Sequence, residues 1–279
     1  MKFLYQVLNI VLYPLNFLLK AIFSKKFNGT VIIIIGNHAS GGTLLYQILV
    51  SVYKVNYLSN ISAKLYKNLF LSQIVNILLG FFKKNFVSSL KSSNGITSGF
   101  FEPNEFGWFW KKIFAKNQNL KHENLENYID ELNCLRNIPF VFKYSIFDKI
   151  EKLSKNINLL TKSKKKLVII RIKRNSYKII NSILERRLKL FNNINFDYGY
   201  FPKKINIIDP YSKVKKQVTF IEKEIDEGLS KISKENIVTL NLDKLKKNPL
   251  KELNKLDKFL SKHSFSKKNK LRKIISKIN

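Results

Sequence analysis

A short glycine-rich segment, flanked by two apolar stretches, is the part of the sequence best suited to binding an anion. Residues 31–35 are apolar and mostly β-branched, which predicts a strand buried on both faces of a parallel sheet. Residues 44–49 have apolar side chains at helical spacing. Between them, residues 36–43 read Gly-Asn-His-Ala-Ser-Gly-Gly-Thr. A strand, a glycine loop and a helix in this order direct backbone N–H groups at a phosphate-like anion.

The segment follows the P-loop pattern G-x-x-x-x-G-K-[ST] with one departure, since Gly42 stands where the lysine belongs. Triphosphate hydrolysis needs that lysine against the β- and γ-phosphates. The loop therefore predicts anion binding without nucleoside triphosphate hydrolysis, and the alternative is a glycine-rich turn that binds nothing. The predicted binding residues are Asn37, His38, Ala39, Ser40, Gly41, Gly42 and Thr43.

This stretch resembles the 5′-phosphosulfate loop of sulfotransferases that use 3′-phosphoadenosine 5′-phosphosulfate (PAPS), whose pattern is a strand, [Arg/Lys]-Ser-Gly-Thr-[Thr/Ser]-x-Leu and a helix. The matching positions are Ser40, Gly41, Thr43 and Leu45. Ala39 replaces the basic residue and Gly42 replaces the first threonine. The resemblance implies PAPS as co-substrate, no metal, and transfer of a sulfuryl group to a hydroxyl or amine.

A second basic site follows the apolar run at residues 167–170, where Arg171 and Arg174 come at the end of the predicted strand. Carboxyl ends of parallel strands are where α/β sheets bind ligands. Arg174 and Ser182, eight residues apart, resemble the family's 3′-phosphate signature, although Asn175 begins the dipeptide that replaces its usual Asp-Pro. The resemblance implies that this pair binds the 3′-phosphate, with Arg171 as the alternative arginine.

Two glutamates, Glu102 and Glu105, lie in an aromatic cluster that includes Trp108 and Trp110. Apolar surroundings raise the pKa of a carboxyl group, which suits a general base. The alternative is ordinary acidic capping at the start of a helix. This arrangement resembles that of several sulfotransferases, in which a glutamate before aromatic residues takes the proton from the acceptor. The resemblance implies this role for Glu102 first and for Glu105 second.

Residues 139–142 predict another buried strand, and Lys143 ends it. Family members commonly have a lysine here that faces the site, so the resemblance implies Lys143 as the replacement for the charge missing at Ala39. His38 is the other candidate for offsetting charge on the leaving group. The alternative for Lys143 is an edge lysine whose stem covers apolar surface while its ammonium group stays in water.

The composition favours anionic partners. The 279 residues include 51 Lys and Arg against 19 Asp and Glu, a formal net charge of +32. That charge suits nucleotides, sulfated substrates or anionic membranes, and no nucleic-acid-binding motif accompanies it. Cys134 is the only cysteine, which excludes an intrachain disulfide and suits a cytoplasmic location. The three histidines have no metal-ligand spacing, so no metal site is predicted.

Residues 3–23 are largely apolar but are interrupted by polar residues and by Pro14, which breaks or kinks a helix. We expect an amphipathic element, either packed on the domain or lying peripherally in a membrane interface. The predicted organisation is an N-terminal segment, residues 1–28, followed by one domain, residues 29–279.

The predicted fold is a three-layer α/β sandwich with a central, mainly parallel sheet, and the resemblance implies the P-loop NTPase-like sulfotransferase form of it. Strands are expected at residues 31–35, 55–58, 139–143, 167–172 and 237–241, and helices over 62–82, 120–135, 146–156 and 211–232. The leading function is a PAPS-dependent sulfotransferase, with a glycan or lipid-linked acceptor favoured by the N-terminal stretch. The alternative is a non-catalytic membrane-surface binding protein on a degenerate sulfotransferase fold, which the departures at Ala39 and Gly42 motivate.

Overall fold

The computed structural model describes residues 2–23, 27–82, 86–107, 130, 135, 138–144, 166–197, 208–263, 265–269 and 271–278. Trp108, Trp110 and the predicted helix over 146–156 lie outside the described residues, as does most of the predicted helix over 120–135.

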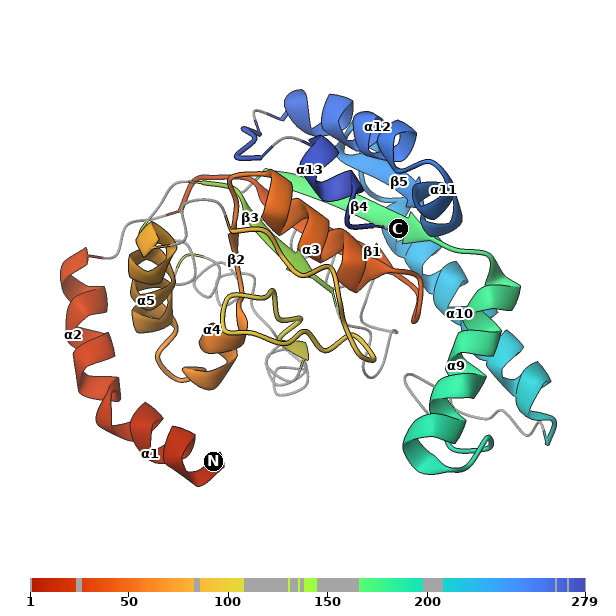
Figure 1. The fold of residues 1–279 in the computed structure, drawn as a ribbon, viewed down its shortest axis with the longest axis horizontal. Coiled ribbons are helices and arrows are strands. Elements are labelled where there is room, and N and C mark those ends of the chain that lie inside the picture. Colours follow the sequence, from red (N-terminus) through yellow and green to blue (C-terminus); the bar gives the residue numbers. More distant parts are fainter. Residues whose placement is uncertain are drawn as a thin grey trace.

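A five-stranded parallel sheet forms the centre of the domain, in the order β2-β3-β1-β4-β5 (Figure 1). The strands are β1 (Val31–Gly36), β2 (Asn56–Tyr57), β3 (Phe140–Lys143), β4 (Leu167–Lys173) and β5 (Ile237–Asn241). Ile34 pairs with Lys143 on one side of β1, and Gly36 pairs with Ile172 on the other. The carboxyl ends of the three middle strands therefore meet at one edge, where the glycine loop begins.

Helices cover both faces of this sheet, as the three-layer prediction requires. The odd-numbered residues of β1 pack with residues of α10 (Pro210–Leu229). The even-numbered residues pack with α3 (Gly42–Val52), α12 (Pro249–Ser261) and α13 (Leu271–Ile275). Residues 31–35 are at most 1% exposed, because a parallel strand covered on both faces has no solvent side. The predicted fold class is confirmed.

The remaining helices lie around these layers. α9 (Ser176–Phe191) follows β4 and packs on α10, and α11 (Leu242–Lys247) follows β5. The predicted helix over 62–82 is two helices, α4 (Asn60–Lys64) and α5 (Leu69–Phe82). The turn between them is held by Asn9, whose Oδ1 accepts from Lys67 N at 3.0 Å, so a contact that is distant in sequence divides the helix.

The N-terminal stretch forms two helices, α1 (Lys2–Val11) and α2 (Tyr13–Phe23), at the outer edge of the molecule beside α5 (Figure 1). Pro14 lies in the first turn of α2, where its missing N–H leaves no hydrogen bond broken. Among the described residues no single helix has both the length and the apolar composition to cross a membrane. α1 and α2 together meet both criteria, but across a bend of 46°.

Candidate functional site

Close approach of neighbouring groups requires glycine at two positions of the loop. A Cβ atom on Gly36 would lie 2.5 Å from the carbonyl oxygen of Ile172 on β4. Gly41 has a φ of +94°, and a Cβ there would lie 2.6 Å from the side chain of Leu242. Larger residues at either position would force the loop away from β4 and α11.

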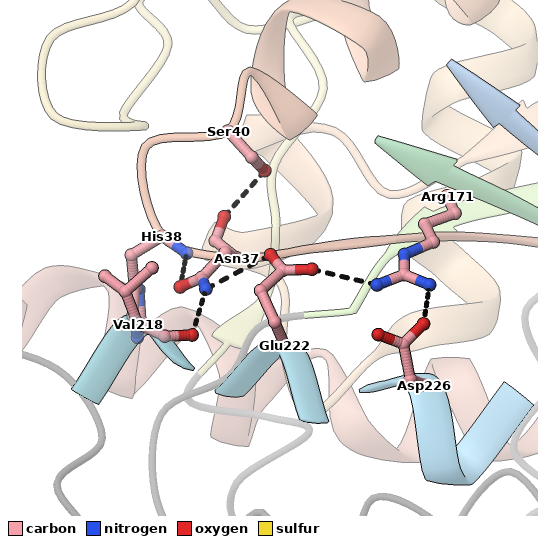
Figure 2. Close-up of polar contacts among 7 residues, drawn as sticks. All are labelled: Asn37, His38, Ser40, Arg171, Val218, Glu222 and Asp226. Carbon is pink, nitrogen blue, oxygen red and sulfur yellow. Dashed lines mark hydrogen bonds and ion pairs between the residues drawn. The ribbon is translucent and has the colours of Figure 1, made fainter. Parts of the chain in front are cut away.

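Two polar side chains of the loop hold its shape and are buried in doing so (Figure 2). Asn37 Nδ2 donates to Val218 O at 3.0 Å and to Glu222 Oε1 at 3.2 Å, both on α10. Ser40 Oγ donates to Asn37 O at 2.6 Å. The side chains of these two predicted binding residues are therefore engaged in holding the backbone of the loop.

Arg171, the alternative arginine, takes part in the same network rather than in the cavity. Its guanidinium donates to Glu222 Oε2 at 2.8 Å and to Asp226, so Glu222 accepts from both the loop and β4 (Figure 2). The Arg171 side chain is 7% exposed. Arg171 therefore ties the sheet to α10 and is not available to a ligand.

The N-terminus of α3 faces the loop without a side-chain cap. Its N-cap is Gly41, whereas α4, α9, α10, α11 and α12 each begin after a Ser, Asn or Asp whose side chain accepts a backbone N–H. The first N–H groups of a helix have no carbonyl partner inside it, and together they attract negative charge. An anion in the loop would occupy the place that a capping side chain takes in the other helices.

A cation from β3 lies across this helix terminus. Lys143 Nζ donates to Thr43 Oγ1 at 3.3 Å and forms an ion pair with Glu105. A Cβ on Gly42 would lie 2.7 Å from Lys143 Cε. The Lys143 side chain thus fills the space that a side chain at position 42 would need, and it brings to the loop the positive charge that a P-loop lysine supplies from that position.

Glu105 already presents an anionic group to this terminus. Thr43 Oγ1 donates to Glu105 Oε1 at 2.5 Å, and the same oxygen pairs with Lys143. A hydroxyl and an ammonium group thus converge on one carboxylate oxygen beside the N-terminus of α3, and the same donors would suit another negatively charged oxygen.

These groups line a cavity of about 320 Å³, here called the loop cavity. Its lining comprises residues 36–44, Ser92, Asn94, Gly95, Glu105, Lys143, Tyr144, Arg174, Arg186, Leu242 and Lys246. Four of its described lining residues are Lys or Arg, while Glu105 is the single acidic one. The excess of positive charge favours a ligand with more than one anionic group.

Arg174 connects the loop to the end of β4. Its Nη1 donates to Ala39 O at 2.9 Å. Its Nε is buried and has no hydrogen-bond partner among the residues that the structure describes. A buried donor without a partner is unfavourable, so Arg174 has a hydrogen-bonding position that a phosphate oxygen would satisfy.

The structure separates some of the predicted site residues. Glu102 does not line the loop cavity. Its buried carboxylate accepts from Ser89 N at 2.7 Å, from Gln47 Nε2 at 3.1 Å and from Ser88 Oγ, and so joins the 86–92 segment to α3. Ser182 is also outside the lining. It lies one turn before Arg186 on the same side of α9.

Sequence reasoning did not assign Lys246 and the 92–95 segment to the site. Lys246 is one of three lysines in the last turn of α11, and no pattern distinguishes it from Lys244 and Lys247. Gly95 was recognisable only as a loop residue. It has a φ of +84°, and a Cβ atom there would lie 3.2 Å from Glu105 Oε1.

His38 is neutral near pH 7. Burial, with the nearby Lys143 and Arg186 cations, lowers the pKa of its imidazole to about 4. A neutral imidazole does not repel those cations, but it also has no positive charge with which to offset negative charge on a leaving group. Lys143 and the arginines supply the charge of this site. Among the described residues, no cluster of three or more His, Cys, Asp or Glu side chains is arranged to hold a metal ion.

The lowered pKa of His38 predicts a pH-dependent stability. Between about pH 6.5 and pH 4 the unfolded chain binds a proton at His38 that the folded protein does not. The contribution to stability is complete above that range and decreases as the pH falls through it. We expect thermal unfolding midpoints to fall from pH 7 to pH 5 less steeply in His38→Gln than in the wild type. Equal slopes would show that His38 does not contribute.

The fold of this chain is similar to that of solved sulfotransferase structures. Sulfotransferase STF9 from Mycobacterium avium superposes with a TM-score of 0.54 at 13% identity, covering 87% of this chain and 66% of that one. The chain has the sulfotransferase fold. It spans just under two thirds of the length of STF9.

Sulfotransferase STF1 from Mycobacterium tuberculosis H37Rv also has the sulfotransferase fold, with a TM-score of 0.53 at 9% identity, covering 96% of this chain and 81% of that one. No protein-family model matches the sequence, and no curated protein matches it either. The predicted resemblance is therefore confirmed at the level of the fold.

Proposed function

We propose that the protein is a PAPS-dependent sulfotransferase whose acceptor provides a hydroxyl or an amine. The observation that carries the proposal is the meeting of Lys143 with the uncapped N-terminus of α3, in a cavity that also contains Arg174 and Arg186. Several cationic side chains from different elements, gathered around one cavity, suit a nucleotide with phosphate groups at two positions.

In this proposal, the backbone of residues 39–43 and the Lys143 ammonium hold the 5′-phosphosulfate. Arg174, with Ser182 and Arg186 on α9, holds the 3′-phosphate. The unpartnered Nε of Arg174 and the convergence of Thr43 and Lys143 on a carboxylate oxygen support the fit. PAPS supplies an activated sulfuryl group. In this proposal the protein residues bind PAPS directly, without a metal ion.

The residues of the chain then act by positioning and by charge. Lys143 stabilises the negative charge that develops on the leaving phosphate. Glu105 accepts the proton from the attacking hydroxyl or amine. Glu105 takes the place of Glu102 here because it lines the loop cavity, whereas the Glu102 carboxylate is enclosed by three donors.

For the acceptor we propose a glycan or a lipid-linked compound. A second, more open cavity of about 460 Å³ is lined by Asn60, Ala63, Lys64, Gly99, Phe100 and Asn104. Asn104 immediately precedes Glu105, so this cavity adjoins the segment that carries the proposed base. An exposed aromatic ring beside amide groups suits a sugar or a polar headgroup.

Calorimetric titration with 3′,5′-adenosine diphosphate, the product left after sulfuryl transfer, tests the donor site. We expect micromolar binding at physiological salt and much weaker binding of ATP, because ATP has no 3′-phosphate for Arg174. The folded protein binding neither nucleotide, or binding ATP more tightly, would contradict the proposal.

Arg174→Ala should weaken binding of this diphosphate roughly tenfold to a hundredfold, because a charge-assisted contact with phosphate is lost. Lys216→Ala on the exposed side of α10 is the control, since it removes one positive charge away from the cavity. Calorimetry on both variants provides the comparison. Equal effects of the two substitutions would remove Arg174 from the site.

A further inference from the structure

The two N-terminal helices have the reverse of the usual polarity. Twelve large apolar side chains of α1 and α2 are between 39% and 76% exposed, among them Phe3, Ile10, Phe17 and Ile22. The buried polar residues of the pair are Asn9, at 0% exposed, and Asn16, at 4%. Surface helices of globular proteins normally place their apolar stripe toward the core, so this pair presents to the outside the face that a helix usually hides.

Specific hydrogen bonds hold the pair in this orientation. Asn9 Nδ2 donates to Lys64 O at 2.7 Å, and Asn68 Nδ2 donates to Asn9 O at 2.9 Å. Leu71 N donates to Asn16 Oδ1 at 3.0 Å. α1 is thus fastened to the turn after α4, and α2 is fastened to α5. Because hydrogen bonds fix both helices against the domain, the orientation of the outward apolar face is set by the fold.

We propose that this face lies in the interface of a lipid bilayer with anionic headgroups. Exposed apolar surface of this extent marks contact with another apolar phase. The pair lies along the bilayer surface, because contacts to α4 and α5 hold each helix against the domain and the chain bends by 46° between them. The phenylalanines and isoleucines of the outward face enter the acyl boundary.

Charge selects the bilayer over a second copy of the chain. Each molecule has a formal net charge of +32, so two apolar faces would have to meet against strong repulsion. Anionic headgroups attract the same charge. Lys20 lies in the last turn of α2, and Lys64 Nζ lies 5.1 Å from the ring centroid of Tyr5 on α1. Lysines beside an apolar helix face are placed to reach headgroups.

Vesicle flotation of the full chain tests the proposal, using phosphatidylcholine vesicles with and without a minor fraction of phosphatidylglycerol. The double variant Ile10→Ser/Phe17→Ser removes two outward apolar side chains without changing the charge. Ile208→Ser/Leu250→Ser is the matched control, because these residues are 96% and 46% exposed and lie outside α1 and α2. Circular dichroism confirms that each variant is folded.

We expect the wild type and the control to float with the phosphatidylglycerol vesicles, and the Ile10→Ser/Phe17→Ser variant to lose roughly tenfold or more in partition coefficient. Wild-type protein should bind phosphatidylcholine alone more weakly. Any of three results would overturn the proposal: no flotation of the wild type, equal flotation of both double variants, or sedimentation showing a dimer that only Ile10→Ser/Phe17→Ser dissociates.

Discussion

Replacing Lys143 with alanine is expected to lower turnover by about 10²–10³-fold, the range found when one preorganised donor to a developing negative charge is removed. Lys143 is the residue that brings an ammonium group across the N-terminus of α3. Its loss would leave Glu105 and the incoming sulfate to repel each other there. Affinity for 3′,5′-adenosine diphosphate should also fall, because the backbone N–H groups alone would then bind the 5′-phosphate.

A second substitution can restore the charge from another position. A Cβ on Gly42 would lie 2.7 Å from Lys143 Cε, so the two side chains cannot occupy this space together. Gly42→Lys alone should therefore displace the flexible end of the Lys143 side chain. In Lys143→Ala/Gly42→Lys the space is open, and the new lysine extends toward the site from the position where P-loops have it.

Steady-state rates with an acceptor found by screening hydroxyl and amine compounds, and calorimetry with the diphosphate, measure these effects. We expect the double variant to recover at least part of the affinity that Lys143→Ala loses. Lys216→Ala is again the control for one lost positive charge. Full activity of Lys143→Ala would show that Lys143 is an edge lysine that only covers apolar surface.

Glu105→Gln is expected to change turnover and affinity in opposite directions. Turnover should fall by roughly 10²–10⁴-fold, because an amide cannot accept the acceptor's proton. Affinity for 3′,5′-adenosine diphosphate should rise about threefold to tenfold, because the carboxylate beside Thr43 and Lys143 no longer competes with the nucleotide's negative charge. A residue with only a structural role would not produce this split.

Glu102→Gln is the matched control, with the same chemical change at the neighbouring buried glutamate. The Glu102 carboxylate accepts from Ser88, Ser89 and Gln47, so this variant should lower the thermal unfolding midpoint while leaving diphosphate affinity unchanged. The rates and affinities of both variants decide between the two glutamates. A large loss of turnover in Glu102→Gln with a normal Glu105→Gln would assign the base to Glu102 instead.

The choice between these glutamates shows where sequence reasoning ends. Both follow a loop and precede aromatic residues, and the segment around them has no helical or strand periodicity from which a direction could be derived. Its course depends on single backbone conformations, such as the positive φ of 107° at Gly99 and of 53° at Phe106. These backbone conformations determine that Glu105, and not Glu102, lines the loop cavity.

Arg171 within β4 and Arg174 just past its end show the same limit for a regular element. Alternation along a strand predicts that Arg171 and its neighbours face opposite sides of the sheet. It does not say which side α10 covers. Only after α10 packs with Glu222 and Asp226 beneath β4 is Arg171 committed to the interior, while Arg174, past the end of the strand, is left for the cavity.

The sequence by itself determined the fold class and the position of the glycine loop, and it marked residues 3–23 as an apolar element whose placement stayed open. These follow from local signals: unbroken apolar runs predict buried parallel strands, and glycines between a strand and a helix predict a tight loop. Only the tertiary structure decided that Lys143 fills the space beside Gly42, and that Asn9 and Asn16 turn inward. Both depend on contacts between residues more than fifty positions apart, which no local pattern contains.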